Sequence, residues 1–493
     1  MKLVSLLALV LCFTYGATAQ KAPIKFGEVP MEDLKMTYYD KDSSAAAVVL
    51  VDYGEAYITI MSSDVKMTIE RHVRIKILRK EGLKWGDVAI LLRQSGSSEE
   101  RITTLKANTY NLVDGKIAIT KLEKDGIFKD KYNRNFTQQK FTMPDVKEGS
   151  VIEYTYKISS DFWTYFPNWQ FQRTIPTRWS EYWAMMPRSF HYEKYMQGYL
   201  TVAVNETKDT YVDGVDVIAH HWVVKNAPAF KEEPFMTSEE DFISRINFAL
   251  AYINFPGRPT QEIMGSWAKL NKVLTEDDDF GRVIERSGFL RDIVTAVTAN
   301  LTDPVQKIEA IHRYVKENVE WDGTEDYYPG DLKKILEKKQ GTSGDINVLL
   351  ASMLDKAGIP VDMVLLSTRS HGFIRQAYPM TRQFNYIICA ARLQDKVLLL
   401  DATEKHLPYT AIPERCLNGQ GLVISKTNHG WINIEPKTKA KSTISVDLKV
   451  SADAEINGTI NISDDGYNAL RTRKEYHSKG EKGFTKDLLD QKR

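Results

Sequence analysis

The sequence Gly341-Thr342-Ser343-Gly344-Asp345 is followed by an apolar run and then by Gly358-Ile359-Pro360. Thr342 or Ser343 can cap a helix here, and a carboxylate such as Asp345 is favourable in a first helical turn. The Gly-Ile-Pro stop predicts the helix end, because glycine suits the C-terminal cap and proline cannot continue a helix. Strands are predicted after it at Val361–Ser367, Phe384–Leu393 and Val397–Asp401. A helix followed by consecutive strands indicates an α+β domain.

Further helices are predicted before this segment. Apolar residues recur at helical spacing over 263–274, 280–286 and 289–298. A stronger helix begins after Thr302 or Asp303, where Pro304 occupies the first position. One more is expected at Leu332–Lys339.

From about residue 45 to 260, apolar residues recur every two residues, as in strands, and not every 3.6 residues, as in helices. In Val65–Leu78, apolar residues alternate with charged and polar ones, as in a half-buried strand with one wet face. Asp114-Gly115 and Asp213-Gly214 each lie between strand-like runs, which is a hairpin signal. This region is therefore predicted to form one large or two consecutive antiparallel β-sandwich modules. A short hairpin, Ile444–Val450 with Glu455–Ile462, and a charged helix are predicted at the C-terminus.

Composition excludes several classes of protein. Hydrophobic residues make up 43% of the chain and charged residues 27%, which is ordinary for a globular protein. The 66 Lys+Arg and 65 Asp+Glu give a net charge of +1, so there is no electrostatic case for nucleic acid as a partner. Nothing suggests a cofactor. No metal site is expected either: the one close histidine pair, His220-His221, would point to opposite faces of a strand.

The first residues predict export. Lys2 precedes the apolar run Leu3–Phe13, and Ala17-Thr18-Ala19 fits an A-x-A cleavage site. We expect residues 1–19 to be a signal peptide cleaved after Ala19, with Cys12 an ordinary residue of its apolar core. No later stretch reaches the roughly 18 apolar residues of a spanning helix, so no integral membrane segment is expected after cleavage. The protein is predicted to be periplasmic or secreted.

The segment from 300 to 435 resembles the transglutaminase-like superfamily, which has a papain-like fold. The family pattern is a glycine, cysteine and aspartate at a helix start, a Gly-Ile-Pro turn, a strand with Phe-Asn-His, and a strand ending in Asp-Ala-Thr. The matching stretches are 341–345, 358–360, 384–386 and 400–403. The resemblance implies that the positions of the catalytic cysteine, histidine and aspartate hold Ser343, Tyr386 and Asp401.

Two of these three positions carry replacements, and both replacements predict a loss of catalysis. A cysteine at a helix start gains from the helix dipole and reacts as a thiolate, whereas serine attacks only beside a general base. A tyrosine, with a usual pKa of about 10, is a poor proton acceptor at neutral pH. We therefore expect a non-catalytic domain that keeps its cleft for binding a peptide or cell-envelope ligand. The candidate cleft residues are Ser343, Asp345, His371, Asn385, Tyr386 and Asp401.

An active enzyme remains the alternative, as a serine- or cysteine-type acyl transferase or hydrolase with a non-standard base. His371 and His406 are the candidates for such a base. Cys389 lies three residues after Tyr386, so it should face the other side of the strand. Cys416 is either free or paired with Cys389. A third reading is purely structural, with Tyr386 filling the cleft.

Residues from about 45 to 240 resemble a β-domain of unknown function that precedes transglutaminase-like domains in exported proteins of Bacteroidetes-type bacteria. Val65–Leu78, Phe141–Tyr156 and Trp169–Pro187 carry the resemblance. The resulting domain prediction is a signal peptide (1–19), a β-sandwich domain (20–240), a helical connection (241–300), a transglutaminase-like domain (301–436) and a C-terminal β/helical segment (437–493).

Overall fold

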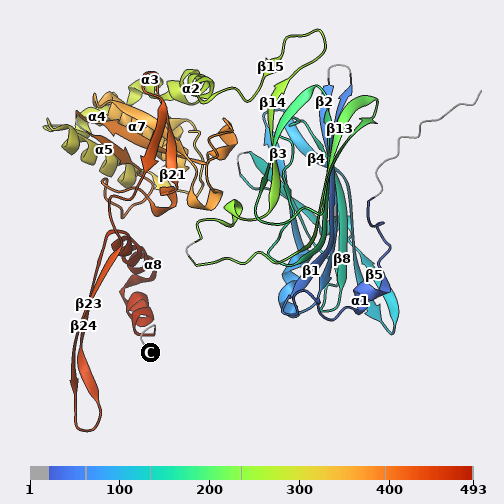
Figure 1. Ribbon diagram of the computed structural model, residues 1–493. Coiled ribbons are helices and arrows are strands. Elements are labelled where there is room, and N and C mark those ends of the chain that lie inside the picture. The colour runs from blue at the N-terminus through green and yellow to red at the C-terminus, as the bar shows by residue number, and fades with distance from the viewer. Residues whose placement is uncertain (1–21, 62–63, 134, 235, 395, 491–493) are drawn as a thin grey trace, which may run out of the picture. The chain divides into compact units, whose positions relative to one another are not determined.

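A computed structural model describes residues 22–490, except 62–63, 134, 235 and 395 (Figure 1). The predicted signal peptide lies outside the described residues. The chain divides into two units. The first comprises the described part of Met1–Pro234 with Phe242–Met264, and the second comprises the described part of Phe235–Asp241 and Gly265–Arg493. No helix among the described residues is both long and apolar enough to cross a membrane.

The first unit is built on an 11-stranded sheet, which its period-two segments form. The order across the sheet is β12 (Val204–Val212), β13 (Val215–Ala227), β10 (Thr177–Pro187), β1 (Ala47–Met61), β2 (Asp64–Ile77), β8 (Val151–Ser160), β4 (Ser98–Val113), β3 (Asp87–Ser95), β7 (Phe136–Thr142) and β6 (Ile127–Lys131), with β5 (Lys116–Lys121) beside β4. The helix α1 (Met31–Lys35) precedes this sheet in the chain.

A smaller sheet completes the predicted sandwich. It contains β11 (Phe190–Gln197), β14 (Arg245–Ile253), β15 (Gln261–Glu262) and β9 (Trp169–Gln170). Apolar side chains from both sheets form a common core, such as Ile58 of β1, Tyr182 of β10 and Phe248 of β14. Burial of these large side chains is the main stabilising contribution to the unit.

Two features of this unit differ from the sequence prediction. The pairing is not antiparallel throughout, because β1 and β10 run parallel. No short turn joins these two strands, so local sequence does not fix their relative direction. In addition, the stretch 241–300, predicted as a helical connection, begins with β14. There Ile246, Phe248 and Leu250 alternate into the sandwich core, and the first helix of the stretch starts at Trp267.

The second unit contains the predicted helices and the predicted sheet. The helices before the sheet are α2 (Trp267–Glu276), α3 (Gly281–Arg286), α4 (Arg291–Val297), α5 (Pro304–Asn318), α6 (Leu332–Lys338) and α7 (Ser343–Lys356). The five-stranded antiparallel sheet has the order β20 (Val397–Leu400), β19 (Tyr386–Arg392), β18 (Val361–Leu366), β21 (Gly419–Ile424) and β22 (Gly430–Ile434). A short parallel pair, β16 (Glu320–Trp321) with β17 (Gln340–Gly341), precedes α7.

The helix α7 is the centre of this unit. It packs against β18 and β19 and is covered by α3, α4 and α5, so every residue from Ser343 to Leu354 is buried. Its apolar residues, including Ile346, Leu350 and Met353, share one core with Leu400 of β20. This packing fixes the start of α7 at one end of the sheet.

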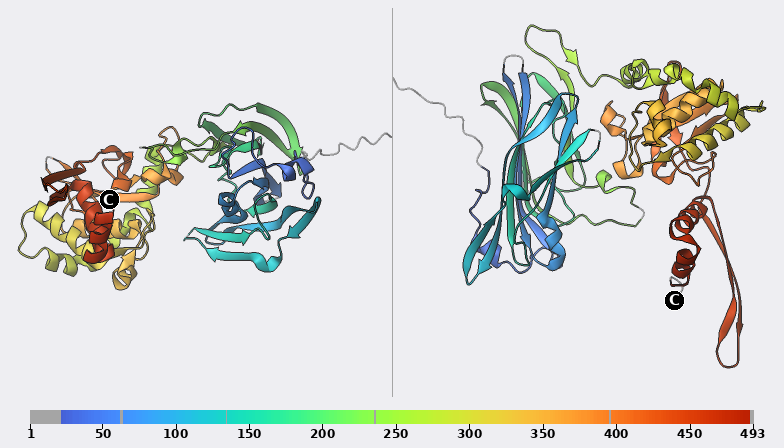
Figure 2. Two further views of the ribbon diagram at one scale, coloured as in Figure 1. Left: turned by 90° about the horizontal axis from the view of Figure 1, so that it is seen from below. Right: turned by 180° about the vertical axis from the view of Figure 1, so that it is seen from behind.

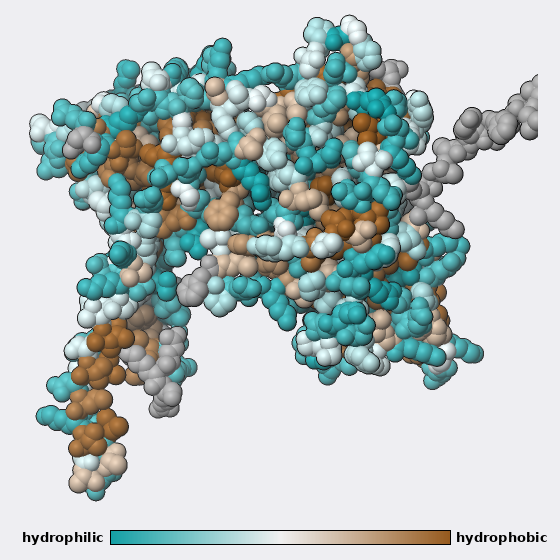
Figure 3. All heavy atoms as spheres, in the orientation of Figure 1, coloured by the Kyte–Doolittle hydropathy of each residue, from teal (hydrophilic) through white to brown (hydrophobic). Residues whose placement is uncertain are grey.

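The unit ends in a hairpin, β23 (Lys441–Val450) with β24 (Ile456–Asp465), and the helix α8 (Gly466–Asp490), as the sequence predicted. The hairpin projects from the rest of the unit in Figure 1 and in the right-hand view of Figure 2. Its cross-strand pairs place seven exposed aliphatic side chains on one face, visible as the brown strip in Figure 3: Ile444, Val446, Leu448, Val450, Ile456, Ile460 and Ile462.

Candidate functional site

The hydroxyl of Ser343 is occupied by the protein's own backbone. Ser343 is fully buried at the first position of α7. Its Oγ donates to the carbonyl oxygen of Asp326 at 2.7 Å and accepts from the amide of Asp326 at 2.9 Å. The capping role belongs to Thr342, whose side chain accepts from the amide of Asp345 at 3.2 Å. Of the two capping candidates, Thr342 is therefore the cap, and Ser343 ties a loop to the helix.

That loop runs from β16 to α6 and covers the first turn of α7. Gly344 permits the close approach: a Cβ atom at this position would lie 2.5 Å from the carbonyl oxygen of Tyr328. Asp345 extends the same contact, since its carboxylate accepts from the amides of Gly330 at 2.5 Å and Thr342 at 2.9 Å. The helix start is consequently capped and packed by polypeptide from the same unit.

Tyr386 and Asp401 are hydrogen-bonded to each other. Tyr386 opens β19, and Asp401 directly follows the neighbouring strand β20. The phenol Oη donates to Asp401 Oδ2 at 2.9 Å, and both residues are almost completely buried. Burial, reinforced by the charge of Asp401, raises the pKa of Tyr386 well above its ordinary value. The phenol therefore stays protonated and donates a hydrogen bond to Asp401.

Asn347, which the sequence prediction missed, joins α7 to both strands. Its Nδ2 donates to Asp401 Oδ2 and to the carbonyl oxygen of Ile387, each at 2.8 Å. Its Oδ1 accepts from the amide of Ala402 at 3.0 Å. Asn347 lies four residues after Ser343, so helical spacing puts the two on one face of α7. That spacing was the available signal.

Arg415 was also missed, because the short 3₁₀ helix that carries it, Glu414–Cys416, has no sequence pattern of its own. Its guanidinium donates to Tyr386 Oη at 3.1 Å, to Thr403 Oγ1 at 2.5 Å and to Glu404 at 2.5 Å. The guanidinium also lies 4.0 Å from the ring centre of Trp321, a cation–π contact. Thr403 in turn donates to Asp401. Tyr386 and Asp401 are thus embedded in a continuous polar network.

Asn385 belongs to a second network beside the first. Its Nδ2 donates to Glu325 at 2.7 Å and to Thr368 Oγ1 at 2.8 Å, and its Oδ1 accepts from the amide of Thr368. Glu325 immediately precedes Asp326 in the loop that covers Ser343. The loop therefore connects the α7 start with the β19 start.

The two histidines weighed as a replacement base have other partners. His371 is exposed, and its Nε2 lies 3.2 Å from the carbonyl oxygen of Arg382. His406 stacks on His477 of α8 with ring centres 4.4 Å apart. A third histidine, His312 on α5, is buried with its Nε2 2.8 Å from the carbonyl oxygen of Asp401. Burial lowers the pKa of His312 to about 4, so its imidazole is neutral at pH 7.

Cys389 and Cys416 are free and buried. They belong to different apolar clusters of the sheet, Cys389 with the α7 core and Cys416 with Tyr386. Cys389 and Tyr386 therefore face opposite sides of β19, as strand alternation requires. Burial raises the pKa of both thiols. Within the described residues, no group of three or more His, Cys, Asp or Glu side chains is arranged to hold a metal ion.

Comparison with known proteins assigns both parts of the chain. Residues 291–436 match the transglutaminase-like superfamily, and residues 63–231 match a domain of unknown function, DUF3857. A search of curated proteins found no match.

Among solved structures, a candidate protease from Parabacteroides distasonis is similar, with a TM-score of 0.55, 15% identity, and coverage of 79% of this chain and 72% of that one. A candidate cysteine protease from Cytophaga hutchinsonii aligns at 10% identity with a TM-score of 0.20, over 83% of this chain and 92% of that one. At such identities the first likeness establishes the fold alone. Residues 291–436 are thus a transglutaminase-like core, and a DUF3857 domain at residues 63–231 precedes it.

Proposed function

We propose that this protein is an exported, non-catalytic transglutaminase-like protein that binds a peptide or a cell-envelope ligand. One observation carries the proposal: the side chains at the nucleophile and base positions, Ser343 and Tyr386, each donate their hydroxyl hydrogen to the protein itself. The residues that would perform acyl transfer serve instead to hold the fold together.

The state of Ser343 supports this reading chemically. Acyl transfer by a serine requires a base that takes the Oγ proton as the oxygen attacks. Here the hydrogen points to the Asp326 carbonyl oxygen, which cannot accept a proton at neutral pH, and the side chain has no exposed surface. A substrate approaching Ser343 would have to displace the loop that contacts Ser343 and Gly344.

The state of Tyr386 supports it independently. In a Cys–His–Asp triad the aspartate orients an imidazole that shuttles protons. Asp401 keeps a bonded partner, but that partner is a phenol whose raised pKa keeps it protonated near pH 7, so its oxygen does not act as a base. The Asp401 carboxylate also accepts from Asn347 and Thr403, so its hydrogen-bonding capacity is used within the protein.

The decisive experiment compares the mature wild-type protein with Ser343→Ala on a broad panel of amide and ester substrates. We expect no transamidation, deamidation or hydrolysis above the buffer rate by either protein. Wild-type turnover that disappears in Ser343→Ala would make the protein an enzyme and overturn the proposal.

A gain-of-function series gives a matched control. Ser343→Cys alone should react slowly with an alkylating probe, because its thiol would still lack an imidazole partner. Ser343→Cys combined with Tyr386→His restores the family's residue types and should react faster. Equal reactivity of the two variants would show that a histidine at position 386 does not activate a thiol at position 343.

Export is the remaining part of the proposal, and it rests on the sequence of residues 1–19. Mass spectrometry of protein recovered from the periplasm or medium should give a mature N-terminus at Gln20 without lipid. An acylated Cys12 at the N-terminus, or an intact Met1, would refute the predicted processing.

A further inference from the structure

A cavity of about 370 Å³ lies in the second unit beside the polar network of Arg415. Its walls come from the C-terminal end of α5, from β16, from the loop after β20 and from α8. Its lining side chains include Trp321, Lys339, Glu404, Lys405, His406 and Lys474. The volume falls within the range of small-ligand sites, and Trp321 supplies an aromatic wall.

Cations dominate this cavity. Lys316, Lys339, Lys405 and Lys474 line it, against the carboxylates of Glu317, Glu320 and Glu404. The carboxylate of Glu404 is buried and already held by two cations, since it accepts from Arg415 and from Lys474 at 2.5 Å each. The lining thus carries four lysines against three carboxylates, so the local charge favours an anion.

The surroundings of His406 show the same excess of positive charge. His406 lines the cavity, and its ring stacks on that of His477. Burial lowers the pKa of His406, and the neighbouring charges of His477, Lys405, Lys316 and Arg473 lower it further. The imidazole of His406 therefore lies among cations that disfavour a positive charge on its ring.

The polar floor of the cavity continues into the degenerate triad. Glu404 is bonded to Arg415, and Arg415 donates to Tyr386 Oη. The Nε of Arg415 is buried without a hydrogen-bond partner among the described residues. A ligand that changes the pairing of Glu404 would thus act on Tyr386 through one intervening side chain.

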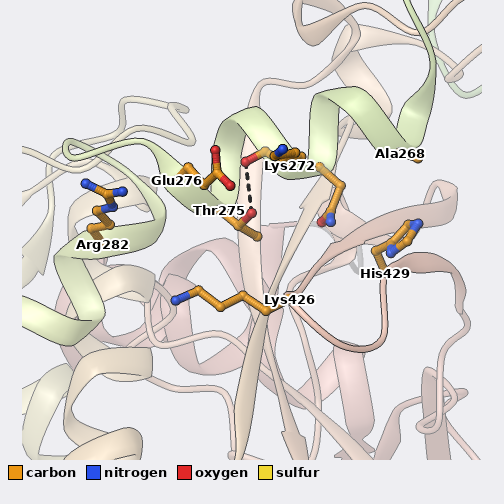
Figure 4. Close-up of a pocket in the computed structure, with 8 residues that line it drawn as sticks. Ala268, Lys272, Thr275, Glu276, Arg282, Lys426 and His429 are labelled. Carbon is orange, nitrogen blue, oxygen red and sulfur yellow. Dashed lines mark hydrogen bonds between the residues drawn. The ribbon is translucent and has the colours of Figure 1, made fainter.

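Another cationic groove serves as a comparison (Figure 4). It has a volume of about 560 Å³ and is lined by Lys272, Arg282, Lys426 and His429, together with Glu276. Its charges differ in one respect: Arg282 and Lys426 are each paired with an exposed carboxylate, Asp278 and Glu285. Most of its lining side chains are exposed, whereas the first cavity has the buried floor of Ala402, Thr403 and Glu404.

We propose that the cavity beside Trp321 and Glu404 binds an anionic group, a carboxylate or a phosphate, through Lys339, Lys405 and Lys474. This goes beyond the proposed function, which assigns no ligand site. The bound anion lies near His406 and neutralises part of the cation cluster.

The experiment follows the imidazole signals of the full mature chain, labelled with ¹³C at histidine Cε1, during a pH titration. His406→Gln identifies the His406 signal. The probes are inorganic phosphate, acetyl-Ala-Ala with a free carboxylate, and the same peptide as its amide, each at about 10 mM, a concentration that saturates millimolar sites. A bound anion should raise the pKa of His406 by about 0.5, the effect of one charge about 6 Å away in a water-like dielectric.

The probes separate the two sources of negative charge. If the pKa of His406 rises with the free peptide but not with its amide, the site binds carboxylates. If this pKa rises with phosphate alone, the site binds phosphate groups. No change in the pKa of His406 with either anion, or an equal change with the amide, overturns the proposal.

Variants locate the site. Lys405→Ala should weaken binding about fivefold, because one exposed cation is lost without unpairing a buried group. Lys474→Ala should weaken it further, and Lys426→Ala in the comparison groove should leave it unchanged. Binding that is weakened by Lys426→Ala and not by Lys405→Ala would place the anion in the wrong cavity for this proposal. Turnover in the Ser343 experiment would refute the proposed function and leave this result standing.

Discussion

Tyr386 Oη lies 2.9 Å from Asp401 Oδ2, and the same carboxylate oxygen accepts from Asn347 Nδ2 at 2.8 Å. This arrangement links β19, the end of β20 and α7 through one buried carboxylate. In the proposed function, the tyrosine keeps the bond to the aspartate but supplies no proton acceptor for catalysis. The energetic contribution of this pair to folding can be measured.

The Tyr386→Phe variant tests that contribution. It removes Oη without changing the ring, and it leaves Asp401 and Arg415 each without one partner. We expect the free energy of unfolding of the second unit to fall by about 1–3 kcal/mol, the cost of unpaired buried polar groups. Urea unfolding, monitored by fluorescence, measures this change in the free energy of unfolding. Tyr199→Phe, at a tyrosine that is 83% exposed, should have no effect. Equal stability of Tyr386→Phe and wild type would contradict a structural role for the phenol.

The loop over α7 makes a steric prediction. In Gly344→Ala the new Cβ would lie 2.5 Å from the Tyr328 carbonyl oxygen, so the loop must move. We expect a loss of about 2 kcal/mol, typical of overpacking. Gly430→Ala is the matched control, because a Cβ there meets no atom within 4 Å. If calorimetry gives the two variants equal stability, the loop can move at little cost in free energy. The loop would then not keep a substrate away from Ser343.

The cysteines predict slow thiol chemistry. Cys389 and Cys416 are free and buried, and burial raises the pKa of both thiols. Little thiolate is therefore present, and it is not accessible to a reagent. The native mature protein should not react with a disulfide reagent such as DTNB, and two thiols should react after denaturation. Fast reaction of one native thiol would show that the sheet opens, whereas no reaction after denaturation would indicate a disulfide.

In the first unit, Glu153 makes a further testable contact. Its buried carboxylate accepts from Arg74, from Tyr110 and from the amide of Gly27, which anchors the N-terminal segment to β8. Burial opposes the charge, but the bonds to His72 and Arg74 outweigh it and lower the pKa of Glu153 to about 2. A lowered carboxylate pKa stabilises the fold above the unfolded value of about 4.3, and this stability is lost as the pH falls toward about 2.

The variant Glu153→Gln should therefore release the segment at neutral pH. Breaking a buried ion pair costs about 3–5 kcal/mol, so hydrogen exchange at residues 22–35 should accelerate. Glu28→Gln, in an exposed pair with Lys25, provides the control and should change little. Unaltered protection in Glu153→Gln would mean that other contacts anchor the segment.

Local sequence rules predicted much of the second unit. The start of α7 follows from the Thr342 cap and Asp345, and its end from Gly358-Ile359-Pro360, because these signals act within a few residues. The strands β18, β19 and β20 follow in the same way from their apolar runs.

The partners of the candidate site were not predictable in this way. Arg415 and His312 reach Tyr386 and Asp401 only through tertiary packing, from a short 3₁₀ helix and from the apolar face of α5. The parallel pairing of β1 with β10 joins segments more than a hundred residues apart, and no turn signal encodes it. Resemblance identified the triad positions, whereas their new hydrogen-bond partners required coordinates.

His312 gives the last prediction, on pH dependence. Its imidazole is 2% exposed, and burial lowers its pKa from about 6.5 to about 4. Below about pH 6.5 the unfolded chain binds a proton that the folded protein does not, so acid favours unfolding. The stability contribution is complete above about 6.5 and declines as the pH falls to about 4, by up to about 3 kcal/mol. In His312→Gln the side chain can still donate to the Asp401 carbonyl oxygen, but it does not titrate.

Urea unfolding of both proteins between pH 7 and 4 should thus show a steeper loss of stability for wild type. His220, whose pKa is also lowered to about 4, titrates in both proteins and cancels in the difference. The exposed His371→Gln should reproduce the wild-type curve. Parallel curves for wild type and His312→Gln would mean that water reaches the imidazole in the folded protein, and that the contact between α5 and Asp401 is looser than the 2.8 Å bond indicates.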